Sequence, residues 1–254
     1  MSLTERLLSV ADGDERAVLF TVVGGPRIGE RLLVLESGER HGDGPHELAE
    51  RAEELLRGGR SRLIEVGDEK VFCELFGPPP QLVVFGAVDT AEALCRAAKL
   101  LGWRTVVGDA RGKFATKERI PSADELIVAW PEEVLARAAP DHATAVVVLT
   151  HEDRWDVPAL ARALATDAFY VGALGSRRNQ ERRRQRLLAE GVAPADIERI
   201  AGPSGLDIGA ESPAETALSI MAEILATRAG REGGPLRKSK GRIHVELEET
   251  PPRK

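Results

Sequence analysis

Apolar positions in the first third of the chain indicate a small mixed domain. Amphipathic segments at 3–10 and 46–59 predict helices, and apolar runs predict strands at 17–23, 31–37, 62–66 and 70–76. Gly67-Asp68, between the last two runs, is typical of a two-residue hairpin turn. We therefore expect residues 1–77 to form a small α+β domain.

From residue 81 onward, short apolar runs alternate with amphipathic segments. The runs lie at 81–87, 104–109, 125–130, 145–150 and 168–173, and the predicted helices lie at 91–102, 158–166, 177–189 and 213–228. Strands that are apolar at every position are buried on both faces, as in parallel sheets. The alternation therefore predicts an α/β fold with a Rossmann-like, doubly wound parallel sheet over 78–230.

The connection between these two patterns is Gly77-Pro78-Pro79-Pro80. Consecutive prolines hold an extended backbone, so we place the domain boundary there. Residues 231–254 are rich in glycine, proline and charged residues and lack sustained periodicity. We expect them to form a flexible tail.

Composition limits the classes of partner. The chain has 254 residues, of which 30% are charged, and its net charge of -6 disfavours nucleic acid. Because the basic residues are concentrated locally, a small anionic ligand fits better than a polyanion. Its two cysteines, Cys73 and Cys95, have no disulfide or zinc-binding spacing, and we expect both to pack in cores. Without a secretory signal or a membrane-spanning run, the chain is expected to be cytoplasmic and to bind no membrane.

The loop after the first strand of the predicted sheet resembles a dinucleotide-binding turn, with one departure. Gly86 and Ala91 fit the outer positions of Gly-x-Gly-x-x-Gly/Ala, but Val88 occupies the middle one. A β-branched side chain there would obstruct a pyrophosphate. Asp109, at the end of the next strand, is placed to bind a ribose hydroxyl. Either the turn binds a nucleotide, or Gly86 only permits a tight turn.

Residues 168–178 predict an anion site. Gly172 and Gly175 bracket a turn, and Ser176 then caps a helix that begins with Arg177 and Arg178. Free N–H groups and the positive end of the helix dipole favour anions at such a point, and arginine adds forked donors. The later arginines of this helix either contribute to the site or form a solvated face balanced by nearby glutamates.

Two further loops hold polar side chains that could act in chemistry. Thr150 and His151 follow another strand, and His151 with Asp153 could belong to a metal cluster or an acid/base pair. The alternative is a hydrogen-bonded loop histidine beside acids that cap a helix. Asp207 lies in a glycine-rich loop, where it is either a buried brace or a ligand contact. Ser212-Pro213-x-Glu215 predicts a capping box.

The chain carries no GxSxG elbow, no GxxxxGK[ST] loop and no HExxH motif, which disfavours a self-contained hydrolase or kinase. Five stretches in this order instead resemble the XdhC/CoxI family, the accessory proteins of xanthine dehydrogenase and carbon monoxide dehydrogenase. The matching segments span most of residues 78–228 and include PPPQLVVFGAVDTAEALCRAAKLLGWRTVVGDAR, TAVVVLTHEDRWDVPAL, FYVGALGSRRNQERRRQRL and GLDIGAESPAETALSIMAEI.

The resemblance implies a cofactor-binding chaperone rather than an enzyme that turns over a metabolite. Such a protein binds the molybdenum cofactor, a molybdopterin in mono- or dinucleotide form, supports its sulfuration with a cysteine desulfurase, and loads it into a molybdenum hydroxylase apoenzyme. It is expected to be a homodimer. The implied cofactor-binding residues are Gly86, Val88, Asp109, Thr150, His151, Asp153, Gly172, Gly175, Ser176, Arg177, Arg178 and Asp207.

Two departures from the family pattern shape these expectations. Many members carry Gly-Ala-Gly-x-x-Ala where this chain has Val88, and a Gly-Gly-Cys segment where it has HGDGPHELAE at 41–50. The second departure predicts that this chain performs no direct thiol chemistry. The alternative function is an NAD(P)- or FAD-binding Rossmann oxidoreductase, against which Val88 argues.

Overall fold

The computed structural model describes residues 2–238 and 248–249. The chain forms two compact units, one of Met1–Pro78 with Gly234–Lys254 and one of Pro79–Gly233. The division falls within the Gly77–Pro80 connection. The flexible tail predicted at 231–254 lies mostly outside the described residues.

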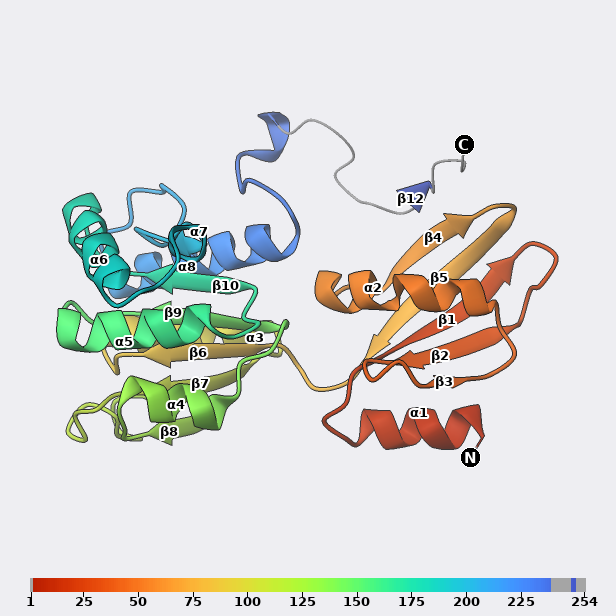
Figure 1. Ribbon diagram of the computed structural model, residues 1–254, viewed down its shortest axis with the longest axis horizontal. Helices are drawn as coiled ribbons and strands as arrows, with labels where there is room; N and C mark the ends of the chain where they lie inside the picture. Colours follow the sequence, from red (N-terminus) through yellow and green to blue (C-terminus); the bar gives the residue numbers. More distant parts are fainter. Residues whose placement is uncertain (1, 239–247, 250–254) are drawn as a thin grey trace. The chain divides into compact units, whose positions relative to one another are not determined.

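The first unit is a mixed sheet with helices on its faces (Figure 1). Its strand order is β12-β4-β5-β1-β2-β3, and only the β12–β4 pair is parallel. The elements are α1 (Leu3–Ala11), β1 (Ala17–Gly24), β2 (Arg31–Leu35), β3 (Arg40–His41), the 3-10 helix η1 (His46–Arg51), α2 (Ala52–Gly58), β4 (Arg62–Val66), β5 (Glu69–Phe76), the 3-10 helix η2 (Leu236–Lys238) and β12 (Glu248–Glu249).

Alternation along β1 builds two cores in this unit. Ala17 and Leu19 pack with α1 on one face, whereas Val18 and Phe20 pack with α2 on the other. Because successive side chains of a strand point to opposite faces, a strand covered on both sides is apolar throughout. Cys73 is buried in the second core, as predicted.

The second unit is a parallel sheet with the strand order β11-β10-β9-β6-β7-β8, which confirms the predicted doubly wound fold. Its elements are β6 (Gln81–Phe85), α3 (Asp89–Leu100), β7 (Arg104–Gly108), β8 (Glu125–Ile127), α4 (Pro131–Ala138), β9 (Thr144–Val148), α5 (Asp153–Leu164), β10 (Tyr170–Ala173), α6 (Arg177–Ala189), α7 (Pro194–Ile197), β11 (Ile200–Ala201) and α8 (Pro213–Arg228).

The helices cover both faces of this sheet. Side chains of α4, α5 and α6 join one core, and those of α3 and α8 join the other, where Cys95 is fully buried as predicted (Figure 1). All the strands run in one direction, so their carboxyl ends share one edge of the sheet. The order of strands reverses between β6 and β9, and the crevice at such a reversal is where doubly wound sheets bind ligands.

Some predicted bounds were wrong, for local reasons. The helix expected at 158–166 begins at Asp153, because Pro158 lies inside α5 rather than at its start. The strand expected over 125–130 ends at Ile127, and Trp130 caps the unpredicted helix α4, whose first residue is Pro131. β10 continues through Gly172 to Ala173, so Gly172 belongs to a strand and not to the turn.

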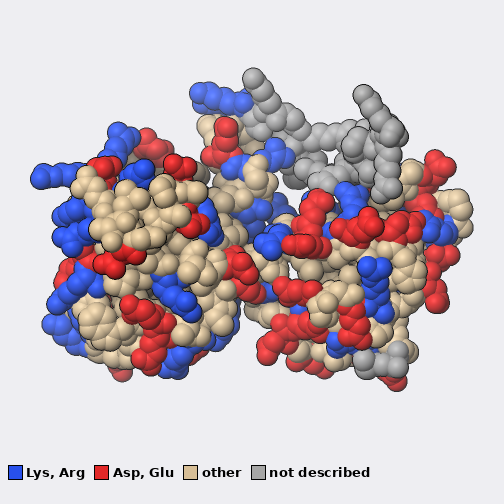
Figure 2. All heavy atoms as spheres, in the orientation of Figure 1, with Lys and Arg blue, Asp and Glu red and all other residues tan. Residues whose placement is uncertain are grey.

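Within residues 2–238 and 248–249, no helix combines the length and apolarity needed to cross a bilayer. On the face shown in Figure 2, basic and acidic side chains are interspersed over each unit. The visible charge therefore forms no continuous basic surface of the kind that binds polyanions.

Candidate functional site

The loops after β6 and β9 meet at the strand reversal. Gly86 has φ +111°, and a Cβ built on it would lie 2.9 Å from Thr150 Cγ2. Only glycine adopts this backbone without strain and leaves room for Thr150. Val88 follows as the N-cap of α3 and offers no side-chain cap. The turn thus requires Gly86 for packing, while its phosphate-binding role stays a prediction.

Asp109 is held inside the fold at the end of β7. It is 2% exposed, and its carboxylate accepts hydrogen bonds from the Ala87 N–H (3.0 Å) and from Arg111 through Nε and Nη2 (2.9 Å each). Burial raises the pKa of Asp109, but the bonds from Arg111 and Ala87 outweigh it and hold the pKa below its usual range. Asp109 braces the loop after β6, so a ribose would have to compete with Arg111 for it.

The N-terminus of α6 has the predicted cap. Ser176 Oγ accepts a hydrogen bond from the Asn179 N–H, which leaves the N–H groups of Arg177 and Arg178 without a helical partner. Ser176, Arg177 and Arg178 are exposed. Among the residues that the structure describes, neither of these two guanidinium groups makes an ion pair or a side-chain hydrogen bond.

Three later arginines of α6 are engaged by α5. Asp153 Oδ2 lies 3.2 Å from Arg182 Nε and 2.9 Å from Arg186 Nε. Arg183 is not part of a solvated face, because it is 3% exposed and its Nη2 lies 2.5 Å from Asp156 Oδ2. These arginines connect α6 to α5 through ion pairs.

Asp156 connects this ion pair to the strand reversal. Its Oδ1 accepts a hydrogen bond from the Thr150 hydroxyl, beside Gly86. Burial raises the pKa of Asp156, and the contacts with Thr150 and Arg183 oppose that rise. The predicted candidate Thr150 is therefore a buried link between α5 and the loop after β6.

α6 differs from the other long helices that begin at the carboxyl edge of the sheet in the charge of its first turn. α6 has no acidic residue in its first turn. The first turns of α3, α4, α5 and α8 carry Asp89 and Glu92, Glu132 and Glu133, Asp153 and Asp156, and Glu215, respectively. Acidic side chains there stabilise the positive end of the helix dipole, and arginines oppose it. The arginines of α6 therefore create a surplus of positive charge where an anion would be stabilising.

The remaining predicted residues are two exposed polar side chains and two glycines. His151 is exposed, and no group of three or more His, Cys, Asp or Glu that could hold a metal occurs among the described residues. Asp207 is also exposed, so the buried-brace interpretation was wrong. Gly172 makes room for Tyr170, since a Cβ on it would lie 2.6 Å from that ring, and Gly175 has φ +128° at the start of the anion turn.

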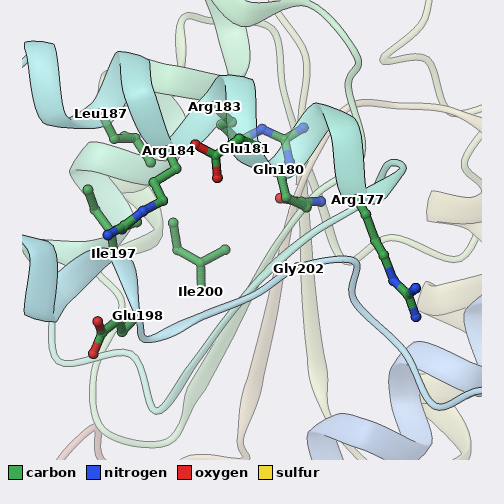
Figure 3. Close-up of a pocket in the computed structure, with 10 residues that line it drawn as sticks. All are labelled: Arg177, Gln180, Glu181, Arg183, Arg184, Leu187, Ile197, Glu198, Ile200 and Gly202. Atoms are coloured by element: carbon green, nitrogen blue, oxygen red, sulfur yellow. Dashed lines mark hydrogen bonds between the residues drawn. The ribbon is translucent and has the colours of Figure 1, made fainter.

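A cavity of about 380 Å³ runs along α6 on the side of α7 and β11 (Figure 3). Its apolar lining comes from Leu187, Ile197 and Ile200. Arg177 lies at one end, toward the N-terminus of the helix, and Arg184 extends over the opposite part of the cavity. Arg177 therefore belongs both to this cavity and to the predicted anion site. The cavity lies beside β11, the outermost strand of the sheet, and not at the strand reversal.

Sequence reasoning missed an aromatic pair at the same edge of the sheet. Trp130, which caps α4, packs against Trp155 in the first turn of α5, with ring centroids 4.4 Å apart. The signal was the order of residues in ELIVAWPEE, because Trp immediately before a Pro that begins a helix lies beyond the strand end and not inside the strand.

Comparisons with known proteins give one family and one fold. The family model described as the XdhC Rossmann domain matches residues 82–224, more than half of the chain. The chain is also similar to a solved structure of a protein described as a xanthine dehydrogenase from Bacillus halodurans, with a TM-score of 0.55 and 20% identity over 94% of this chain and 98% of that chain. This likeness supports the fold alone.

Three curated relatives are more similar in sequence. A protein of Bacillus subtilis (strain 168), named as a probable xanthine dehydrogenase subunit, is 35% identical over 62% of this chain and 46% of that protein. The uncharacterized protein YqeB of Escherichia coli (strain K12) is 30% identical over 92% and 42%. The molybdenum cofactor insertion chaperone PaoD, also of Escherichia coli, is 35% identical over 38% and 30%. The chain spans less than half the length of these relatives.

Proposed function

This chain belongs to the XdhC family, and on that premise we propose that it is an accessory protein that binds the molybdenum cofactor and helps to insert it into a molybdenum hydroxylase. The recipient would be of the xanthine dehydrogenase or carbon monoxide dehydrogenase type. The relatives named as a xanthine dehydrogenase subunit and as an insertion chaperone support this direction. The chain acts here as a chaperone that holds the cofactor and not as a redox enzyme.

One observation carries the proposal, the pair of arginines at the N-terminus of α6 that no described acid engages. A molybdopterin ends in a phosphate, and a mono- or dinucleotide form carries phosphate as well. Ser176 fixes the end of the helix, the N–H groups of Arg177 and Arg178 stay open, and both guanidinium groups are exposed. A phosphate bound there would accept backbone and forked side-chain hydrogen bonds and neutralise the charge surplus.

The loops at the strand reversal would orient the rest of the ligand. Gly86 permits close approach of backbone to its neighbours, and Asp109 and Thr150 hold the surrounding loops through buried hydrogen bonds. When bound, the cofactor supplies the dithiolene-held molybdenum used by the recipient enzyme. The chain's own residues bind its anionic group and fix its orientation.

The two cysteines do not fit a role as sulfur carriers. Both are fully buried, and burial raises the pKa of the Cys95 thiol to about 12, so its reactive thiolate form is scarce at neutral pH. We therefore propose that sulfuration of the cofactor depends on a partner cysteine desulfurase. This chain would present the cofactor to that partner and would not carry sulfur itself.

Ligand-detected purification tests the proposal. The full chain is purified without oxygen from a host that makes molybdenum cofactor, and bound small molecules are identified by mass spectrometry. We expect a pterin phosphate with the wild-type chain and its depletion in the Arg177→Ala/Arg178→Ala variant. Arg182→Ala is the matched control, because it removes an arginine of the same helix that is paired with Asp153. NAD(P) or FAD without pterin would contradict the proposal and favour a redox enzyme.

A further inference from the structure

Trp130 is a large aromatic side chain exposed at the ligand-binding edge of the second unit. It is 55% exposed, whereas the buried Trp103 and Trp155 are 4% and 7% exposed. It lies between the end of β8 and the start of α4, on the edge to which the loops after β6, β7 and β9 also belong. Its exposure therefore coincides with the position at which this fold binds ligands.

Trp155 fixes Trp130 from one side. The two ring centroids are 4.4 Å apart with planes tilted by 46°, and Arg154 lies over the Trp155 ring with its guanidinium carbon 4.7 Å from the centroid. This contact orders the exposed indole before any ligand arrives, which lowers the entropic cost of a further contact. Trp155 Nε1 is buried without a hydrogen-bond partner among the described residues, so the pair itself contains one unsatisfied donor.

Charged groups border the aromatic pair. Glu152 lies 2.7 Å from Arg154 and 3.7 Å from Arg111, and Arg111 in turn holds Asp109. The side chains of Glu152 and Arg154 are about half exposed or more. The carboxylate and guanidinium groups beside the aromatic pair suit the hydrogen-bonding edges of a heterocycle.

We propose that Trp130, ordered by Trp155, is a stacking platform for a flat heteroaromatic ring of the ligand. The ring is the pterin or, in a dinucleotide form, the nucleobase, and both present the same chemistry to an indole face. The inference rests on the proposed function only in taking a ligand that carries such a ring. It assigns to α4 and α5 the recognition of the ring, and leaves the anion to α6.

Calorimetric titration of the full chain with two phosphate-free ring probes, pterin and cytidine, tests the platform. We expect Trp130→Ala to weaken binding of the favoured ring by about 5- to 150-fold, the range found for stacking on aromatic side chains. Trp130→Phe keeps an aromatic face and should stay within about fivefold of wild type. Leu100→Ala is the control, because it truncates an exposed apolar side chain at the last residue of α3, the end of that helix away from the carboxyl edge of the sheet. The probe that responds to Trp130 identifies the ring.

Other outcomes separate this inference from the proposed function. If Trp130→Ala binds both rings as wild type does, or if wild type binds neither, the platform is wrong, even where Arg177 and Arg178 still retain a pterin phosphate. If Trp130→Ala keeps ring binding but no longer captures the apoenzyme, Trp130 is a protein-docking residue and the inference fails. If wild type releases no pterin on purification but binds a ring through Trp130, the platform stands and the proposed function fails.

Discussion

The helices α5 and α6 begin at the same edge of the same sheet, but their first turns carry opposite charges. α5 begins with Asp153 and Asp156, which stabilise its positive end, whereas α6 begins with Arg177 and Arg178. Basic residues at a helix N-terminus are unfavourable by about 0.3–1 kcal/mol each. The acids of α5 thus satisfy its positive end within the fold, whereas under the proposed function a bound anion would do so for α6.

The comparison also divides the arginines of α6 into two groups. Arg182, Arg183 and Arg186 contact the acids of α5. Arg177 and Arg178 in the first turn, and Arg184 farther along the helix, contact no acid among the described residues. The first group should therefore affect the stability of the fold and the second the binding of a ligand. The predictions below test this division in order of decreasing effect.

The largest expected effect is on stability. Arg183→Ala leaves Asp156 buried without its cation, which costs about 3–5 kcal/mol in the free energy of unfolding. Urea denaturation measures the change. Arg178→Ala removes a cation that opposes the helix dipole, so it should not lower the free energy of unfolding and should raise it by up to about 1 kcal/mol. Replacing both partners, as Arg183→Met/Asp156→Leu, should recover most of the loss, and an equal loss in Arg178→Ala would remove the distinction between the two groups.

Arg111 should stabilise the fold at neutral pH and lose that effect in acid. Arg111→Ala removes hydrogen bonds to the buried Asp109 and should cost about 1.5–3 kcal/mol at pH 7. The pKa of Asp109 is lowered in the folded state, so this stabilisation is present above its unfolded pKa of about 3.9 and is lost as pH falls through the lower folded pKa. The free energies of unfolding of wild type and Arg111→Ala, measured by denaturation at each pH from 7 to 2, should therefore converge as the pH falls.

Lys113→Ala is the control for this pH dependence. Lys113 shares the Phe114 ring with Arg111, at 5.2 Å against 4.3 Å, but does not contact Asp109. Its effect should be small and independent of pH below 5. If Arg111→Ala is equally destabilising at all pH values, the contact with Phe114 and not the one with Asp109 accounts for the loss.

Arg177 and Arg178 should contribute to ligand binding and not to the stability of the fold. Each substitution by alanine is expected to weaken the ligand by about 1–3 kcal/mol, because each removes a charge-assisted contact. Calorimetry with the purified pterin phosphate measures the affinity, and Arg182→Ala should retain it. Unchanged affinity in both single variants would assign these arginines to the solvated surface.

The sequence predicted the architecture well because it depends on local, repeated patterns. Continuous apolar runs and amphipathic segments gave the parallel sheet, and Ser176 and Ser212 gave the two caps that the structure shows. Gly67-Asp68 gave the hairpin of β4 and β5. Each of these features needs only neighbouring residues for its explanation.

The site was predicted less well because it depends on contacts distant in sequence. Nothing near Arg183 in the chain shows that it is buried against Asp156, 27 positions earlier. Asp109 has the spacing of a ribose ligand, yet Arg111 already holds both of its oxygens. Such pairings follow from how helices and loops pack, and periodicity carries no information about them.

The most direct test of the central claim is the stability of the ligand-free chain after charge reversal at α6. Arg177→Glu/Arg178→Glu places acids where α5 has them, and each change removes an unfavourable charge and adds a favourable one. The free energy of unfolding should therefore rise by about 0.6–2 kcal/mol per substitution, while the pterin phosphate no longer binds. A ligand-free variant that is less stable than wild type, or one that still retains the ligand, would contradict the claim that an anion completes this helix.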